Sequence, residues 1–490
     1  MSFQYLSTVS FMNSHIQKTR LVKYLLILGI GLMGCAKSMN PDIERGSDYN
    51  FRDGYPEVRF SAIGLIDDEG EPKIDIAADI VLGSLIYNKE GDKYISNITI
   101  DVQVINQTNP DNIIGAKQYK IDIEKEDPDI VYSQQIRTFE QELDVEPGRY
   151  TINFTLTDQS SDKRITHSTE TYLPNPESNV SNLTNIRMEG KNMSSENPSW
   201  SPLTTYDVPG RVDSLKFVFQ VTNNNSSEPL TIDSQLLRFE SDTSYARPMH
   251  YNNYSPSSIQ YKGIDYDEEE VIQSTRRTLV EPGNVLIEFT FGNQRRGNYR
   301  FEVQTNISSE ESGEAYKARD FAVKSKNYPA IKSARELARP LVYLMREKEY
   351  EQLIAINDPD SLKKSVDRFW LRNIGNKSRA KSVLKKYYNR VEEANKQFSN
   401  FKEGWKTDPG MMYILLGPPW YVDERLDEMY WSYSYNRSDP ERNFYFFEPR
   451  NKNEFFPFNH YILRRSQSYF NLQYQQIELW LSGSIMQRNL

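Results

Sequence analysis

The sequence predicts a multidomain protein in which two all-β, sandwich-like domains precede a C-terminal α+β domain. Up to about residue 325, apolar and polar residues alternate as in half-buried antiparallel strands, and turn clusters recur at short intervals. From Tyr328 the apolar spacing changes to the three-to-four-residue period of amphipathic helices. The 490 residues are also enough for about three domains of roughly 150 residues each.

Residues 1–34 have the layout of a secretory signal peptide. A basic segment (18–23) precedes the mostly apolar residues 24–34, and Cys35, the single cysteine of the chain, follows directly. The apolar run is too short for a comfortable membrane span. The segment resembles bacterial lipoprotein signals, in which the cysteine is acylated, and this implies a membrane anchor at Cys35. A transmembrane anchor with an incidental cysteine is the alternative.

Two further features concern processing and location. Met12 lies just before the basic segment, so translation from either Met1 or Met12 is compatible with a signal. After Cys35 comes Ala36 rather than an aspartate, and by analogy with other lipoproteins this favours the outer membrane. A single cysteine provides no intrachain disulfide.

Charge is unevenly distributed along the chain. The net charge of −9 argues against a general nucleic-acid binder. Residues 326–490 carry 27 Lys and Arg against 20 Asp and Glu, a net charge of +7, whereas residues 35–325 carry −19. The simplest interpretation is that the basic C-terminal part docks on the acidic middle of the same chain.

The first β domain is predicted at 59–174, after a polar tether at 35–58. Two segments show the alternation of a half-buried strand: Ile98, Ile100, Val102 and Val104, then Tyr150, Ile152, Phe154 and Leu156. Short spacing between turn signals favours a sandwich. The second β domain is predicted at 175–325, and its alternating residues include Leu215, Phe217, Phe219 and Val221.

A short repeat links the two β domains. Gly148-Arg149-Tyr150 and Gly297-Asn298-Tyr299 each begin a late strand, which suggests two related sandwiches. The acidic run 265–270 could be a calcium site, because hard cations bind several carboxylates. It lacks the spacing and glycine of a calcium loop, so a solvated acidic loop is favoured.

The C-terminal domain is predicted at 326–490. It begins with a predicted helix at 333–345, bent at Pro340, and a second helix is predicted after an N-cap at Asp358. The strongest helix is predicted at 380–398. Its basic residues form a candidate anion-binding or partner-binding face: Lys381, Lys385, Lys386 and Arg390. A face that meets the acidic sandwiches is the favoured alternative.

The segment Gly404-Trp405-Lys406-Thr407-Asp408-Pro409-Gly410 precedes a predicted strand at 411–416 and the stop Gly417-Pro418-Pro419. Together with Phe369-Trp370 upstream and Tyr430-Trp431-Ser432-Tyr433 downstream, it resembles the GWxTD domain of envelope proteins from Bacteroidetes-like bacteria. The resemblance covers roughly 326–490. Pro409 and Met411 stand where the family usually has basic residues, so a ligand role of those positions is in doubt here.

These motif residues are interpreted as structural. Gly404 and Gly410 permit backbone angles that other residues avoid, and Thr407 and Asp408 can hydrogen-bond neighbouring amides. Trp405 is expected to fill a gap between helix and sheet.

Candidate catalytic, cofactor-binding and metal residues are not found in the sequence. The four histidines are scattered, and no zinc-protease, nucleophile-elbow or phosphate-loop pattern occurs: His15, His167, His250 and His460. A pair of glycosidase carboxylates remains an open alternative, because sequence does not show their separation. The aromatic residues Trp420-Tyr421 and Tyr430 to Tyr435 would stack on sugars if exposed, although their alternation favours burial of one face.

We therefore expect a lipid-anchored cell-envelope protein that binds or scaffolds without catalysis at the outer membrane, in export or surface assembly, with an envelope protein as partner. A glycan-binding or glycan-cleaving envelope protein is the alternative.

Overall fold

The computed structural model describes these residues: 43–46, 54–67, 70–108, 113–133, 135–176, 181–194, 198–223, 229–252, 263–306, 315–425, 428–434, 442–448 and 458–487. The signal segment and Cys35 lie outside them. Among these residues, no helix combines the length and apolar character needed to cross a membrane.

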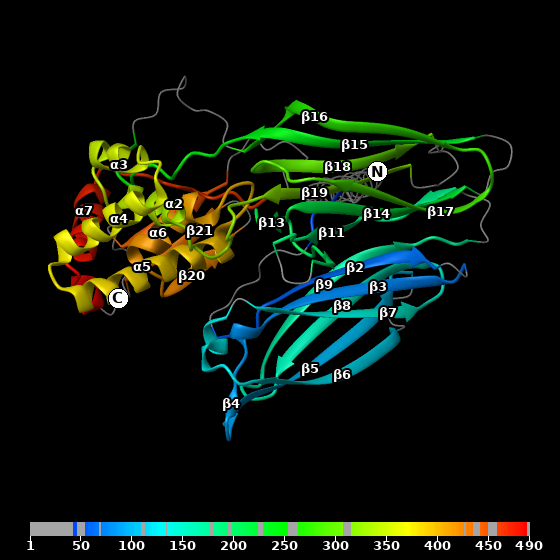
Figure 1. The fold of residues 1–490 in the computed structure, drawn as a ribbon, viewed down its shortest axis with the longest axis horizontal. Helices are drawn as coiled ribbons and strands as arrows, with labels where there is room; N and C mark the ends of the chain where they lie inside the picture. The colour runs from blue at the N-terminus through cyan, green and yellow to red at the C-terminus, as the bar shows by residue number, and fades with distance from the viewer. Residues whose placement is uncertain are drawn as a thin grey trace, which may run out of the picture. The chain divides into compact units, whose positions relative to one another are not determined.

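The first sandwich packs a three-stranded sheet on a larger one (Figure 1). The smaller sheet has the order β2-β3-β7: β2 (Val58–Ile66), β3 (Pro72–Val81) and β7 (Ile136–Asp144). The larger has the order β4-β5-β8-β9, with β6 also paired to β5: β4 (Asn88–Glu90), β5 (Lys93–Asn106), β6 (Ile113–Lys125), β8 (Gly148–Asp158) and β9 (Lys163–Leu173). Two short 3-10 turns are η1 (Leu82–Ser84) and η2 (Pro128–Tyr132). The alternating apolar residues of β5 and β8 are buried between the sheets.

The second sandwich repeats this plan. One sheet has β14 (Ser214–Asn223) between β11 (Arg187–Lys191) and β17 (Gly283–Phe291), with short β10 (Asn182–Leu183) and β12 (Trp200–Pro202). The other has the order β16-β15-β18-β19: β15 (Leu230–Ser241), β16 (Ile264–Leu279), β18 (Gly297–Thr305) and β19 (Tyr316–Val323). The short β1 (Ile43–Glu44) and β13 (Asp207–Val208) both pair with β19 in parallel.

Two sequence expectations change here. Ile43 and Glu44, within the predicted tether, pair with Ala318 and Arg319, so this part of the segment is bound to the second sandwich. The acidic run 265–270 lies on strand β16 rather than in a loop, and Glu270 pairs with Arg238 and Arg295 across the surface. Among the described residues, no cluster of His, Cys and acidic side chains could hold a metal.

The two sandwiches have the same strand order. In each, the first, second and fifth main strands form one sheet (β2-β3-β7 and β11-β14-β17), and the third, fourth, sixth and seventh form the other. In both, the tyrosine at the start of the sixth strand donates to a carbonyl four residues upstream. Tyr150 Oη bonds Glu146 O at 2.5 Å, and Tyr299 Oη bonds Arg295 O at 2.7 Å. Such a tyrosine corner is typical of immunoglobulin-like sandwiches. The Gly-x-Tyr repeat therefore marks equivalent positions in two related domains.

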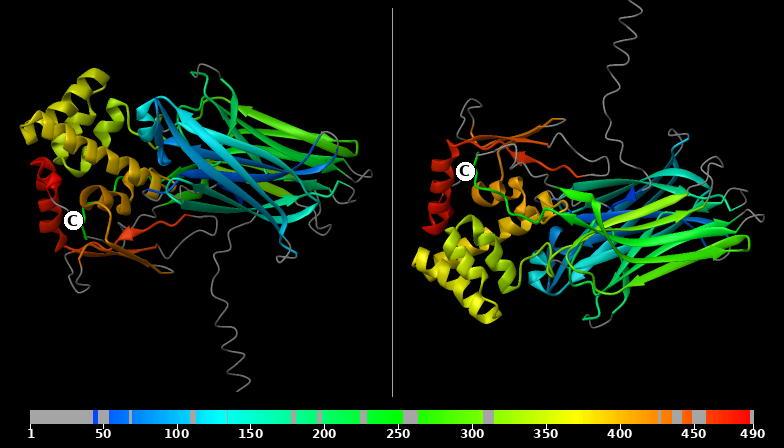
Figure 2. Two further views of the ribbon diagram at one scale, coloured as in Figure 1. Left: turned by 90° about the horizontal axis from the view of Figure 1, so that it is seen from below. Right: turned by 90° about the horizontal axis from the view of Figure 1, so that it is seen from above.

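The C-terminal domain is α+β, as predicted, and contains these helices: α2 (Ala334–Ala338), η5 (Arg339–Tyr343), α3 (Glu347–Ile354), α4 (Pro359–Ile374), α5 (Lys377–Phe398), η6 (Gly404–Lys406), α6 (Asp408–Leu416), α7 (Tyr469–Leu481) and η7 (Ser484–Met486). A small antiparallel sheet completes it: β20 (Tyr421–Glu424), β21 (Glu428–Ser432), β22 (Asn443–Phe447) and β23 (Ile462–Leu463). Asp358 caps α4 as the sequence predicts, by accepting from the Ser361 amide. α6 packs against α5, α7 and β23 (Figure 2).

The predicted strand at 411–416 is wrong, because these residues belong to helix α6. Thr407 is the N-cap, its hydroxyl accepting from the Gly410 amide at 3.1 Å, and Pro409 suits the first helical turn. All nine residues of α6 are buried, so the helix is apolar on every side and lacks the periodicity by which surface helices are recognised. Gly417, at φ +93°, ends a helix rather than a strand.

The two tyrosine corners predict matched losses of stability. Tyr150→Phe and Tyr299→Phe should each lower the free energy of unfolding by about 1–2 kcal/mol, because each leaves a carbonyl without its hydroxyl donor. Urea unfolding of the soluble Cys35→Ala protein measures this. Tyr119→Phe is the control, because the Tyr119 ring packs on Phe139 and its hydroxyl has no hydrogen bond with the described residues. Equal effects in all three variants would contradict the assignment.

Candidate functional site

The tryptophan of the motif is a packing centre between the C-terminal domain and the second sandwich. Trp405 is 3% exposed and stacks on Tyr245, which follows β15, with ring centroids 5.3 Å apart. Tyr343 Oη donates to Trp405 O at 2.7 Å, and the indole N–H donates to Glu403 at 3.1 Å. The side chain is therefore fixed on both its apolar and its polar side.

The motif glycines allow three backbone segments to approach closely. A Cβ atom on Gly404 would lie 1.9 Å from the Ala394 carbonyl oxygen of α5, and one on Gly410 would lie 1.9 Å from the Gly404 carbonyl oxygen. Both distances are far inside van der Waals contact with rigid backbone. Only glycine fits at these positions without a shift of α5, η6 or α6.

The aspartate of the motif binds an arginine of the C-terminal segment. The Arg465 guanidinium donates to the two carboxylate oxygens of Asp408 at 2.7 and 2.8 Å, and the Leu463 amide donates to Asp408 at 2.8 Å. Arg465 also donates to the carbonyls of Arg247 and Pro248 in the segment after β15. Asp408 thus joins β23, the motif and the second sandwich, and every one of these contacts is internal to the chain.

Glu403, directly before the motif, is the charged centre of the junction. Its carboxylate is 3% exposed and accepts from Arg296 at 2.6 Å and from the Ser325 amide at 3.2 Å, and Lys406 Nζ lies 3.5 Å away. Burial opposes ionisation of Glu403, yet Lys406 and Arg296 outweigh it and lower its pKa to about 2. Glu403 is therefore an anion at any physiological pH.

Further ion pairs cross from the C-terminal domain to the β domains. Lys402 pairs with Asp242 at 2.9 Å, and Lys396 pairs with Glu57 of the first sandwich at 2.8 Å. Burial by itself would raise the pKa of Asp242, but the charge of Lys402 outweighs this effect, and the pKa is lowered. Lys324, which follows β19, pairs with Asp207 within the second sandwich at 3.1 Å and donates across the junction to the Asn400 carbonyl at 2.6 Å. Basic residues of the C-terminal domain thus meet acidic residues of the β domains.

The residues that make these contacts are not the predicted ones. On α5, Lys381 and Lys385 are exposed, and burial together with nearby Arg390 lowers the pKa of Lys386. Arg390 turns inward, donating to Ile414 O at 3.2 Å with its guanidinium 5.2 Å from the Trp480 ring centre. The structure therefore separates Arg390 from this group, and the face with the exposed Lys381 and Lys385 stays a prediction.

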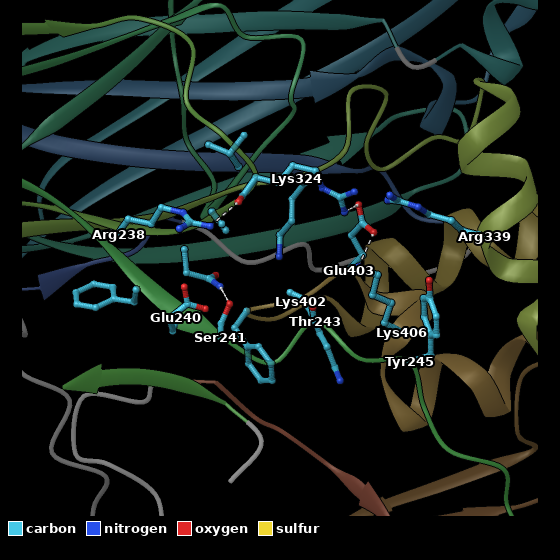
Figure 3. A pocket seen from close by; sticks show the side chains of 17 residues that line it. Arg238, Glu240, Ser241, Thr243, Tyr245, Lys324, Arg339, Lys402, Glu403 and Lys406 are labelled. Carbon is cyan, nitrogen blue, oxygen red and sulfur yellow. Dashed lines mark hydrogen bonds and ion pairs between the residues drawn. The ribbon is translucent and has the colours of Figure 1, made fainter. Parts of the chain in front are cut away.

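A pocket of about 350 Å³ lies beside Glu403, between the second sandwich and the C-terminal domain (Figure 3). Its charged lining consists of six cations and two carboxylates: Arg238, Arg296, Lys324, Arg339, Lys402 and Lys406, with Glu240 and Glu403. Burial lowers the pKa of Lys406 to about 8, because Glu403 offsets only part of the desolvation and Arg296 and Arg339 add repulsion. This concentration of positive charge makes the pocket the candidate binding site.

The sequence did not identify this pocket. Its residues come from β15, β18, the end of β19, η5, η6 and the segment before the motif, which are far apart in the sequence. The available signal was the charged pair Lys402-Glu403 and Lys406, which flank Gly404 and Trp405. The sequence does not show which strands lie opposite these three residues, because that depends on the tertiary fold.

The other predicted positions are distributed. Gly417 lies against Arg390 and accepts from Tyr433 Oη at 2.7 Å, Pro418 is exposed and Pro419 is partly buried. Of the aromatic cluster, Trp420 and Tyr421 are 45% and 46% exposed, whereas Tyr430, Trp431 and Tyr433 are buried. His167, His250 and His460 do not converge with acidic residues on a metal site in the described part of the chain.

Comparison with known proteins identifies the C-terminal part. Residues 305–482 match the GWxTD domain. No curated protein matches the chain. Among solved structures, red sea bream transglutaminase matches with 11% identity over 54% of this chain and 31% of its own, at a TM-score of 0.17. Trypsin-activated alpha-2-macroglobulin from Escherichia coli matches with 12% identity over 55% of this chain and 17% of its own, at a TM-score of 0.15. Neither likeness supports an argument about fold or function.

The packing of Trp405 predicts a large loss of stability on truncation. Trp405→Ala should lower the free energy of unfolding of the C-terminal domain by about 3–5 kcal/mol, because it removes a buried ring and leaves Glu403 without one donor. Trp420→Ala, at a position 45% exposed, is the matched control and should cost about 1 kcal/mol or less. Chemical denaturation of the full-length Cys35→Ala protein measures both. Equal losses would show that Trp405 is not the packing centre.

Lys406 predicts a pH dependence of stability. Below pH 8 the folded protein keeps a charged ammonium in a buried, cationic site, whereas at higher pH the folded form releases this proton before the unfolded chain does at about 10.4. Unfolding then takes up a proton, so rising pH stabilises the fold. Between pH 7 and 10 the wild type should gain about 1–3 kcal/mol relative to Lys406→Met. Lys381→Met, an exposed control, should show no such trend. If the difference in the free energy of unfolding between the wild type and Lys406→Met does not change with pH, the burial argument is contradicted.

Proposed function

Because the chain carries a GWxTD domain, we propose that it is a lipid-anchored protein of the cell envelope with a non-catalytic binding or scaffolding role at the outer membrane, in export or surface assembly. In this proposal Cys35 provides the anchor, and the two sandwiches and the GWxTD domain form the platform that an envelope partner binds.

One observation supports the scaffolding role most directly: the polar groups of the motif, and of Glu403 directly before it, are engaged in contacts within the chain, and the contact of Glu403 joins two domains. Asp408 binds Arg465, Thr407 caps α6, and Glu403 binds Arg296 of the second sandwich. A carboxylate held in bidentate contact with an arginine is poorly placed to act as an acid or base. The motif therefore serves to fix the GWxTD domain on the sandwich, which suits a rigid binding platform.

A second candidate is glycan recognition. In the small sheet, Trp420 and Tyr421 at β20 and Tyr445 and Phe447 of β22 are each between 41% and 46% exposed. Aromatic rings with exposed faces can pack against sugar rings, and Tyr adds a hydroxyl for hydrogen bonding. Tyr445→Ser and Phe447→Ser would reduce retention on an envelope-glycan affinity column if this role holds, and would leave it unchanged if the surface has another use.

The anchor is tested by fractionation. Cys35→Ala should move the protein out of the membrane fraction or cause the unprocessed precursor to accumulate, because no thiol remains for acylation. Met39→Ala keeps the cysteine and serves as the matched control. If Cys35→Ala stays membrane-bound at the mature mass, the proposed lipid anchor at Cys35 is wrong.

The scaffolding role is tested separately, by crosslinking the anchored protein in cells and identifying captured envelope proteins. Capture that is equal for the soluble and anchored forms would contradict a role at the membrane.

A further inference from the structure

The pocket beside Glu403 contains more positive charge than its own carboxylates match. Four of its six cations have a carboxylate within 3.2 Å, and these pairs are Arg238 with Glu270, Arg296 with Glu403, Lys324 with Asp207, and Lys402 with Asp242. Two cations remain. The side chain of Arg339 has no ion pair or hydrogen bond within the described part of the chain, and Lys406 shares Glu403 with Arg296 at the longer distance of 3.5 Å.

These two groups point toward the same space from different elements. Arg339 begins η5 and Lys406 ends η6, and in Figure 3 Arg339 extends toward Glu403 while Lys406 lies just below that carboxylate. Lys406 is 8% exposed, so its charge is held away from bulk water. A buried excess charge is costly unless a counterion joins it. The remaining lining carboxylate, Glu240, is exposed on the strand β15 and is not close-paired with either cation in the described structure.

The chemistry of the two unmatched groups indicates the type of anion. A guanidinium presents a planar fork of donors that matches two oxygens of a phosphate, and a lysine ammonium adds a point charge. A phosphate monoester carries about −1.5 to −2 charges at pH 7, which balances two cations, whereas a single carboxylate balances one. A volume of about 350 Å³ lies near the lower end of the range of about 300–1,000 Å³ for ligand pockets, so it suits a small group.

We propose that this pocket binds a phosphate group, with Arg339 and Lys406 as its principal charged ligands and with Arg296 holding Glu403 beside it. The ligand is inorganic phosphate or a phosphate carried on a sugar. This inference goes beyond the scaffolding role and does not depend on it, since a protein without an envelope partner could still bind phosphate.

Binding is coupled to protonation of Lys406. The pKa of this lysine is about 8, so at pH 8 about half of the molecules carry a neutral amine. A bound phosphate favours the ammonium and raises that pKa. Binding at pH 8 should therefore take up a fraction of one proton, up to about half.

The experiment is isothermal titration of the soluble, full-length Cys35→Ala protein with inorganic phosphate and with glucose 6-phosphate, at constant ionic strength. Each titration is repeated at pH 8 in two buffers of different ionisation enthalpy, which reveals the proton uptake.

We expect one site per chain. Arg339→Gln should weaken binding at least tenfold, and it removes no side-chain hydrogen bond or ion pair within the described part of the chain. Lys406→Met should weaken binding and remove the proton uptake. Arg368→Gln, an exposed arginine on α4, is the matched control and should bind as the parent does.

Each outcome decides the proposal. Tighter binding of glucose 6-phosphate identifies a sugar phosphate as the source of the group, and equal binding identifies the phosphate alone as sufficient. The proposal is overturned if neither compound binds, if Arg339→Gln and Arg368→Gln bind equally well, or if acetate competes as effectively as phosphate. None of these results bears on the anchor at Cys35, which fractionation tests.

Discussion

The buried carboxylate of Glu403 is the constraint on which the junction between the second sandwich and the GWxTD domain depends. It receives the Trp405 indole and the Lys406 ammonium from its own segment, and it receives Arg296 and the Ser325 amide from the sandwich side. Removing a carboxylate from water costs several kcal/mol, and contacts of this quality are needed to offset it. The negative charge therefore favours one arrangement of the two domains, because any other docking would remove Arg296 and the Ser325 amide from it.

The same reasoning explains why the motif has its residue types. Gly404 and Gly410 permit the close approach of η6 to α5 and α6, which brings Glu403 and Trp405 to the sandwich. Asp408 then ties the far end of the motif to Arg465 and, through it, to the segment after β15. The residue types of the motif are thus required by packing and by the burial of charge. Their spacing is set by the geometry of one short 3-10 turn followed by a helix.

Local chemistry made much of the fold predictable. Period-two alternation in β5 and β8, the N-cap at Asp358 and the Gly-x-Tyr repeat each depend on neighbouring residues, and each appears in the structure at its predicted position. The error at 411–416 has a physical cause: a helix buried on all sides has no polar face, and its short apolar sequence cannot be told from a buried strand. Thr407 and Pro409 carried the capping signal that favours the helix.

The pocket beside Glu403 could not be predicted in this way. Arg296 and Glu403 are separated by 107 residues, and Lys402 and Asp242 by 160, so their meeting depends on how whole domains dock. The opposite net charges of the two halves indicated that docking would occur but not which residues would pair. Once most of the opposite charges are matched at the junction, Arg339 and Lys406 are left in excess. Desolvation and the nearby Arg296 and Arg339 disfavour the charged form of Lys406, and Glu403 offsets only part of this effect. The presence of Lys406 beside Arg339 is the mark expected of a site in which a ligand supplies the missing negative charge.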